Sequence, residues 1–223
     1  MSKTQEVAIH VTSLMKRLRS ELILQGLDFQ AHYGDVVVIV GANGSGKTLL
    51  LRILSGLVYA DGGMVQVGAT TLRKTWWGIV PQDVGVMIEQ PGFLPYLRGR
   101  DNLRLLARLR QRIPDESVTQ AMEEVGLDPH SRKKVRQYSL GMRQRLAIAQ
   151  AFMEQPQIVL LDEPTNGIDP DYLPQFLSRV RDYADQGRAV VITTHELAHF
   201  APISDQILTL RQGRLESRQE ERS

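Results

Sequence analysis

The chain has 223 residues, 42% of them hydrophobic and 23% charged, with a formal net charge of +2, as in one ordinary globular α/β domain; so mild a charge argues against nucleic acid as the main ligand. It has no cysteine, which excludes disulfides and thiolate metal sites, and the spacing of its histidines predicts no structural zinc. It lacks both an apolar run of the ~20 residues that a membrane span needs and the apolar core of a signal peptide, so we expect it to stay in the cytosol.

Residues 7–40 alternate short apolar stretches with turns, which predicts a small antiparallel layer leading into a parallel core. The apolar run Val36 to Val40 ends at GANGSGKT, Gly41 to Thr48, and the helical pattern LLLRIL follows. A buried strand, a glycine-rich loop and a helix start together predict a phosphate-binding loop. We therefore expect a polyphosphate ligand, with Lys47 at the β- and γ-phosphates and the Thr48 hydroxyl on Mg²⁺.

The middle of the chain is predicted to be helical. The pattern runs from about Asn102 to Gly126, with a break at Pro114 after which Asp115 is expected to cap a new helix, and another helix is expected after Ser139. The sequence therefore predicts one domain of the P-loop NTPase class, in which 1–88 and 156–223 form an α/β core with the antiparallel layer and about 89–155 form an inserted helical subdomain.

Two further buried strands are predicted, and polar residues follow each of them. The strand Ile158 to Leu161 ends at Asp162 and Glu163, where a phosphate-loop NTPase needs a carboxylate for its metal. Asp162 is expected to bind Mg²⁺, and Glu163 to act as the general base on the attacking water. The strand Ala189 to Thr193 leads to His195.

Several segments together resemble the ATP-binding cassette (ABC) proteins. YSLGMRQRLAIAQAF, from Tyr138 to Phe152, and LLDEPTNGIDP, from Leu160 to Pro170, resemble the signature segment, the Walker B strand and the D-loop, and TTHE resembles the switch-histidine segment with His195. Within the family, SLGMRQR, PTNGIDP and VGVMIEQPGFLPYLRGRDNL look most like the ATPase subunits of bacterial exporters for bacitracin, lantibiotics and related drugs.

The resemblance implies that two chains share each ATP. Ser139 and Gly141 would bind the γ-phosphate of ATP held by a second subunit, His195 would contact the γ-phosphate and orient Glu163, and Asp169 would lie at the dimer seam. The implied catalytic residues are Glu163, His195 and Lys47, and the implied metal ligands are Thr48, Asp162 and Glu89. The implied nucleotide contacts are Gly41, Ala42, Asn43, Gly44, Ser45, Gly46, Lys47, Thr48 and Leu49 of the loop, with Leu18, Glu89, Ser139, Gly141 and Asp169 from elsewhere.

Three positions depart from the family pattern. Leu140 replaces a glycine and Met142 a glutamine in the signature segment, which keeps the serine and the second glycine. Leu18 stands where an aromatic residue usually stacks on adenine, so we expect loose base selectivity unless Tyr33 substitutes.

The third departure concerns the Q-loop. Gln82 in VPQ is one candidate, but the family residue stands about thirteen positions before the asparagine that here is Asn102, and this spacing selects Glu89. We expect Glu89 at the position and keep Gln82 as the alternative. A carboxylate there adds negative charge to an acidic site.

The expected function is that of an ATP-hydrolysing subunit, with ATP and Mg²⁺ as cofactors. It would pair with a second copy of itself or a homologous ATPase subunit and drive a separate integral membrane permease, as an exporter, from the cytoplasmic face of the membrane. Residues Pro91 to Gly99 are a candidate docking loop or, equally, a packed cover of the helices. Alternatives are a soluble ABC ATPase without a permease, a haem or polysaccharide export subunit, and a nucleotide-gated module without hydrolysis, against which Glu163 argues.

Overall fold

The computed structural model describes residues 6–72, 80–89 and 92–217. One of its two sheets is antiparallel and has the strand order β2-β1-β4-β5. Its strands are β1 (Val7–Leu18), β2 (Glu21–His32), β4 (Gly62–Val67) and β5 (Thr70–Leu72). The antiparallel layer that the first forty residues predict is therefore present, and it extends to two strands beyond the phosphate loop.

The other sheet has six strands in the order β10-β9-β3-β8-β7-β6. They are β3 (Val36–Val40), β6 (Val84–Met87), β7 (Ile158–Asp162), β8 (Ala189–Thr194), β9 (Gln206–Arg211) and β10 (Arg214–Ser217). All neighbouring pairs are parallel except β9 with β10. The predicted parallel core is confirmed.

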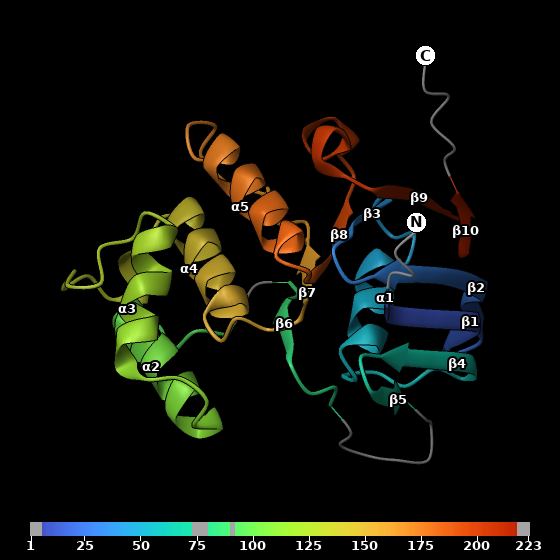
Figure 1. Ribbon diagram of the computed structural model, residues 1–223, viewed down its shortest axis with the longest axis horizontal. Helices are drawn as coiled ribbons and strands as arrows, with labels where there is room; N and C mark the ends of the chain where they lie inside the picture. Colours follow the sequence, from blue (N-terminus) through green and yellow to red (C-terminus); the bar gives the residue numbers. More distant parts are fainter. Residues whose placement is uncertain (1–5, 73–79, 90–91, 218–223) are drawn as a thin grey trace.

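Three helices follow one another between β6 and β7, at the far end of the molecule from β1, β2 and β4 (Figure 1). These are α2 (Gly99–Arg110), α3 (Asp115–Glu124) and α4 (Leu140–Phe152); α1 (Lys47–Leu54) follows β3, and α5 (Leu173–Asp185) lies between β7 and β8. Short 3₁₀ turns occupy Val135–Gln137, Leu197–His199 and Ala201–Ile203. In the described part of the chain, no helix is both long and apolar enough to cross a bilayer. The subdomain boundaries near 89 and 155 stay a prediction.

The predicted start of α4 is confirmed, and the predicted cap of α3 is not. The Ser139 hydroxyl caps α4 by accepting a hydrogen bond from Met142 N at 3.1 Å. The expected cap at Asp115 is wrong, because Pro114 occupies the N-cap and Asp115 is the first helical residue. Its carboxylate pairs with Arg104 of α2, which lowers the pKa of Asp115.

Each central strand of the six-stranded sheet is apolar on both faces. In β3, Val36 and Val38 pack with residues of α2, α3, α4 and α5, whereas Val37 and Ile39 pack with α1 and the antiparallel sheet. All four side chains are fully buried. A strand covered on both faces needs a continuous apolar run, which is why VVVIV lacks polar alternation.

The parallel pairing determines where the polar residues meet. In β3, β6, β7 and β8 the chain runs the same way, so the loops after all four strands emerge at one edge of the sheet. The strand ends are also linked directly, since Gly41 N donates to Thr194 O at 3.1 Å and Glu163 N donates to Thr193 O at 2.9 Å. This edge carries the candidate functional residues.

Candidate functional site

The loop between β3 and α1 has the backbone geometry of an anion-binding loop. Gly46 is the N-cap of α1 with a φ of 104°, and no side chain caps the helix. The first N–H groups of α1 are therefore free of a side-chain acceptor at the positive end of the helix. A Cβ at Gly41 would lie 2.6 Å from Leu210 O, so that position too requires glycine.

Lys47 is the buried cation of this loop, with 5% of its surface exposed. Its Nζ donates to Gly41 O at 2.7 Å and to Ala42 O at 3.1 Å, and it lies 3.2 Å from Glu163 Oε1. The ammonium group is thus held over the loop and faces the strand end that carries the acidic pair.

Two hydroxyl groups hold the carboxylate of Asp162. Thr48 Oγ1 donates to Asp162 Oδ2 at 2.8 Å, and Thr193 Oγ1 donates to Oδ1 at 2.6 Å. Asp162 and Thr193 are buried. Thr193 was not among the predicted site residues; the signal that could have found it is its place at the end of a buried strand, two residues before His195.

These groups fit a Mg²⁺-bound polyphosphate. The Ser45 hydroxyl is buried in the loop with no hydrogen-bond partner, so an oxyanion above the loop would satisfy it. Thr48 and Asp162 place a hydroxyl and a carboxylate oxygen beside each other, and Mg²⁺ in nucleotide sites takes one or two such protein ligands and leaves the rest to phosphate and water.

Glu163 follows Asp162 in an unusual backbone conformation. Its φ is 46°, in the left-handed region that glutamate rarely adopts. Its Oε2 accepts from His195 Nδ1 at 2.8 Å and from His195 N at 3.3 Å, while Oε1 faces Lys47. The structure therefore brings Lys47, Glu163 and His195 into one cluster at the carboxyl ends of β7 and β8.

The two Q-loop candidates lie at opposite ends of β6. Gln82 precedes the strand, and its Oε1 accepts from Arg112 at 2.5 Å. Glu89 follows the strand, on the edge that carries Asp162, and its Oε2 lies 2.7 Å from Arg52 of α1. Arg52 as a partner of Glu89 was not predicted, because nothing in the local sequence links a helix to a loop 37 positions away.

The adenine-stacking alternative at Tyr33 is wrong. Tyr33 lies before β3 whereas the phosphate loop follows that strand, so the two occupy opposite edges of the sheet. Burial, and then the carboxylates of Glu6 and Asp83, raise the pKa of Tyr33. Leu18, by contrast, is the last residue of β1 and 48% exposed. Its partner strand β2 reaches the phosphate loop, because a Cβ at Gly46 would lie 2.8 Å from Leu24.

The signature and D-loop residues lie on a different part of the surface from the loop of Lys47. Ser139 and Asp169 are exposed and Gly141 is half-buried. Asp169 Oδ1 accepts from Asp171 N at 3.0 Å, so it caps a turn before α5. Ser139 and Gly141 begin α4, in the helical group that Figure 1 shows away from α1.

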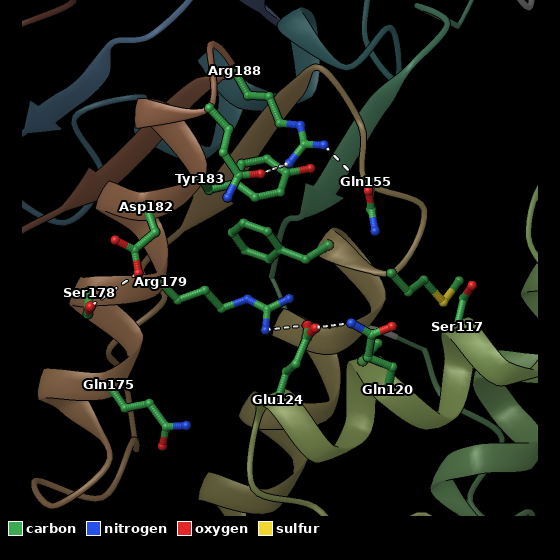
Figure 2. A pocket seen from close by; sticks show the side chains of 14 residues that line it. Ser117, Gln120, Glu124, Gln155, Gln175, Ser178, Arg179, Asp182, Tyr183 and Arg188 are labelled. Carbon is green, nitrogen blue, oxygen red and sulfur yellow. Dashed lines mark hydrogen bonds and ion pairs between the residues drawn. The ribbon is translucent and has the colours of Figure 1, made fainter.

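A cleft of about 470 Å³ lies between α3, α4 and α5, and its lining is drawn in Figure 2. Glu124 and Arg179 form an ion pair across it at 2.5 Å, and Arg188 lies over the Tyr183 ring. None of the residues expected at the nucleotide lines this cleft. The candidate site is therefore at the strand ends described above and not in this cleft.

Comparison with known proteins identifies the family. A family model described as ABC transporter matches residues 24–166. The ABC transporter ATP-binding protein YdbJ of Bacillus subtilis is 36% identical over 95% of this chain and 69% of its own length. The bacitracin transport ATP-binding protein BcrA of Enterococcus faecalis is 33% identical over 94% of this chain and 68% of its own length.

A comparison of structures agrees with the family match. The structure of the ATP-binding cassette MJ0796, a dimer in a post-hydrolysis state bound to ADP and Pi, superposes with a TM-score of 0.84 at 22% identity, over 96% of this chain and 99% of that one. This likeness confirms the predicted P-loop NTPase fold, and the family match confirms the resemblance noted in the sequence. The chain belongs to the ABC transporter family, as one of its ATP-binding ATPases.

Proposed function

We propose that this chain binds Mg·ATP as a dimer and hydrolyses it to drive a separate membrane permease. The observation that carries the proposal is the convergence of Lys47, Asp162, Glu163 and His195 at one edge of the sheet. Lys47 comes from the loop after β3, Asp162 and Glu163 from the end of β7, and His195 from the end of β8. Together they would supply a cation for the phosphates, a metal ligand, a general base and a hydrogen-bond donor.

The two oxygens of Glu163 have different partners, which suits a general base. Oε1 lies 3.2 Å from Lys47 Nζ, and Oε2 accepts from His195. The carboxylate is thus held in one orientation beside the cation that would bind the γ-phosphate. General-base catalysis of this kind is typically worth ~10²–10⁴ in rate.

The separation of the signature segment from the loop of Lys47 supports dimerisation around ATP. Ser139 is the N-cap of α4, and Gly141 lies in its first turn. The Ser139 side chain is exposed, and this helix N-terminus lies away from the loop of Lys47. A second subunit would bring these groups onto the γ-phosphate, as the dimeric relative MJ0796 suggests. The partner would be a second copy or a homologous ATPase subunit, and Asp169 would lie at the seam.

The permease partner and the direction of transport rest on the relatives. BcrA is named as a bacitracin transport protein. Because bacitracin is an antibiotic, we infer that this chain serves an exporter and works from the cytoplasmic face of the membrane. The candidate docking loop, of which residue 91 lies outside the described residues, exposes Leu94 and Tyr96 by 42% and 68%. It is also held firmly, since Asn102 Oδ1 accepts from Leu94 N at 2.7 Å and Nδ2 donates to Leu94 O at 3.1 Å. An apolar, well-anchored loop suits protein docking.

Gel filtration of Glu163→Gln with and without Mg·ATP tests the proposal. The amide keeps the size of Glu163 but cannot accept the proton of the attacking water, so ATP should stay bound and the variant should elute as a dimer only with Mg·ATP. The same substitution in a Lys47→Ala background is the control and should need a higher concentration of Mg·ATP to form the dimer. A Glu163→Gln variant that stays monomeric at saturating Mg·ATP contradicts the shared site.

A further inference from the structure

The segment that carries Glu163 is held from the side by α4. Gln144, in the second turn of that helix, is buried at 9% exposure. Its Nε2 lies 3.0 Å from Pro164 O and 3.3 Å from Glu163 O and donates to both. A side-chain amide has two N–H donors, so one residue satisfies both carbonyls.

The backbone of Glu163 needs such support. Its φ of 46° is sparsely populated for residues other than glycine and asparagine, and it persists only where neighbouring contacts determine it. On one side, Glu163 N donates to Thr193 O of β8. On the other, Glu163 O accepts from Asn166 N at 3.1 Å and from Gln144. Gln144 thus links this conformation to α4, as the hydrogen bond to Thr193 links it to β8.

The first turn of α4 contacts the chain after Glu163, at Gly167. A Cβ at Gly167 would lie 2.5 Å from Leu140 Cδ2, and a Cβ at Gly141 would lie 2.9 Å from Gly167 O. The departure at Leu140 therefore has a structural counterpart, because its side chain fills the space above Gly167. Residues 163–167 pack along two turns of the helix whose N-terminus carries Ser139.

We propose that Gln144 is a positioning residue that fixes the backbone of Glu163 and so couples the catalytic base to the signature helix. The proposal rests on the function proposed above, in which Ser139 faces ATP on the other subunit. A shift of α4 on contact with that phosphate would move the Gln144 amide and, with it, the carbonyls of Glu163 and Pro164. Each base would then be aligned fully only when the opposite site is occupied.

Two nearly isosteric variants test the hydrogen bonds themselves. Gln144→Met removes both donors, and Gln144→Glu places oxygens against the two carbonyls. We expect kcat for ATP hydrolysis to fall about tenfold in the first and further in the second, as for partial loss of a general base, while KM changes less than about twofold. Gln150→Met, six residues further along α4, is the matched control and should keep the wild-type kcat. Equal kcat in Gln144→Met and wild type overturns the proposal.

A double-mutant cycle shows whether the effect passes through Glu163. In a Glu163→Ala background, measured by single turnover, Gln144→Met should cause less than about a twofold further loss. A full additional tenfold loss there would mean that Gln144 acts elsewhere, and would overturn the proposal.

Dimer formation separates this inference from the proposed function. Glu163→Gln with Gln144→Met should still elute as a dimer with Mg·ATP, because the amide serves the base and not the seam. A dimer lost only on adding Gln144→Met means that Gln144 supports the signature helix instead, which overturns the inference. A dimer already absent in Glu163→Gln alone counts against the proposed function.

Discussion

Lys47 and Glu163 form an ion pair at the mouth of the phosphate loop, with 3.2 Å between Nζ and Oε1. The side chains are 5% and 17% exposed, so the pair is shielded from water. In the proposed function the lysine would therefore have two roles, since it would supply positive charge for the phosphate and offset the charge of the base that must stand beside that phosphate.

Lys47→Ala should weaken ATP binding about ten- to a hundredfold, because charge-assisted hydrogen bonds are worth ~1.5–3 kcal/mol. The loss has a second component, since Glu163 would then face the phosphates without its cation. Removing that charge in Lys47→Ala/Glu163→Gln should recover part of the affinity. Calorimetric titration with Mg·ATP measures all three proteins, and an unchanged Kd in Lys47→Ala would contradict the loop assignment.

Glu89→Ala should lower ATP turnover and abolish its stimulation by the permease, while leaving ATP affinity nearly intact. The reason is that Glu89 follows β6 at the edge that carries Asp162, where it pairs with Arg52. Glu89→Gln separates two roles: it should keep activity if the residue acts by hydrogen bonding and lose it if the carboxylate binds Mg²⁺.

Gln82→Ala is the control for that position. Gln82 contacts Arg112 before β6 begins, so the variant should hydrolyse ATP almost as wild type. Steady-state rates with and without the membrane partner decide between the two residues. A crippled Gln82→Ala beside a normal Glu89→Ala would reverse the assignment.

Leu18 should leave the protein with weak base selectivity. An aliphatic side chain that is 48% exposed can cover a purine but cannot stack as a ring does. ATP and GTP should therefore compete within about tenfold, a gap of ~1.4 kcal/mol. Leu18→Tyr should raise affinity for both nucleotides in competition assays, and a thousandfold preference for ATP in the wild type would show that another residue reads the base.

Asn102→Ala should destabilise the fold and loosen the candidate docking loop. The substitution leaves Leu94 N without its acceptor and removes the donors to Leu94 O and Arg98 O, at a cost of about 1–3 kcal/mol in the free energy of unfolding. Asn102→Asp keeps the acceptor and should lose less. Urea unfolding measures the order of the three proteins, and equal midpoints would mean that the loop is held by other contacts.

Local sequence was enough to predict the parts of the site that are continuous in the chain. The loop from Gly41 to Thr48 and the strand before Asp162 are short, and their residue types determine both conformation and chemistry. The family resemblance added Ser139 and His195, which no local rule connects to a phosphate.

Contacts between elements that are distant in the chain could not be predicted from the sequence. Thr193 and Gln144 meet Asp162 and Glu163 only because β7 and β8 pair and α4 packs beside them. The error at Tyr33 has the same origin, since the sequence alone does not tell at which end of the strands a residue lies.

Gly46 makes the phosphate loop depend on the antiparallel sheet as well as on the nucleotide. Its φ is 104°, and a Cβ there would lie 2.8 Å from Leu24 Cδ2 and 3.4 Å from Ile23 Cγ2, both on β2. Any side chain at this position would strain the backbone, and its Cβ would force the Leu24 side chain of β2 to move, before ATP is added. A variant of this glycine could lose activity because it misfolds or because it fails to bind phosphate. An activity assay does not separate these two causes, so inactivity alone does not show that Gly46 contacts phosphate. Melting temperature recorded without nucleotide distinguishes the two, and enzymologists who mutate such loops need that measurement first.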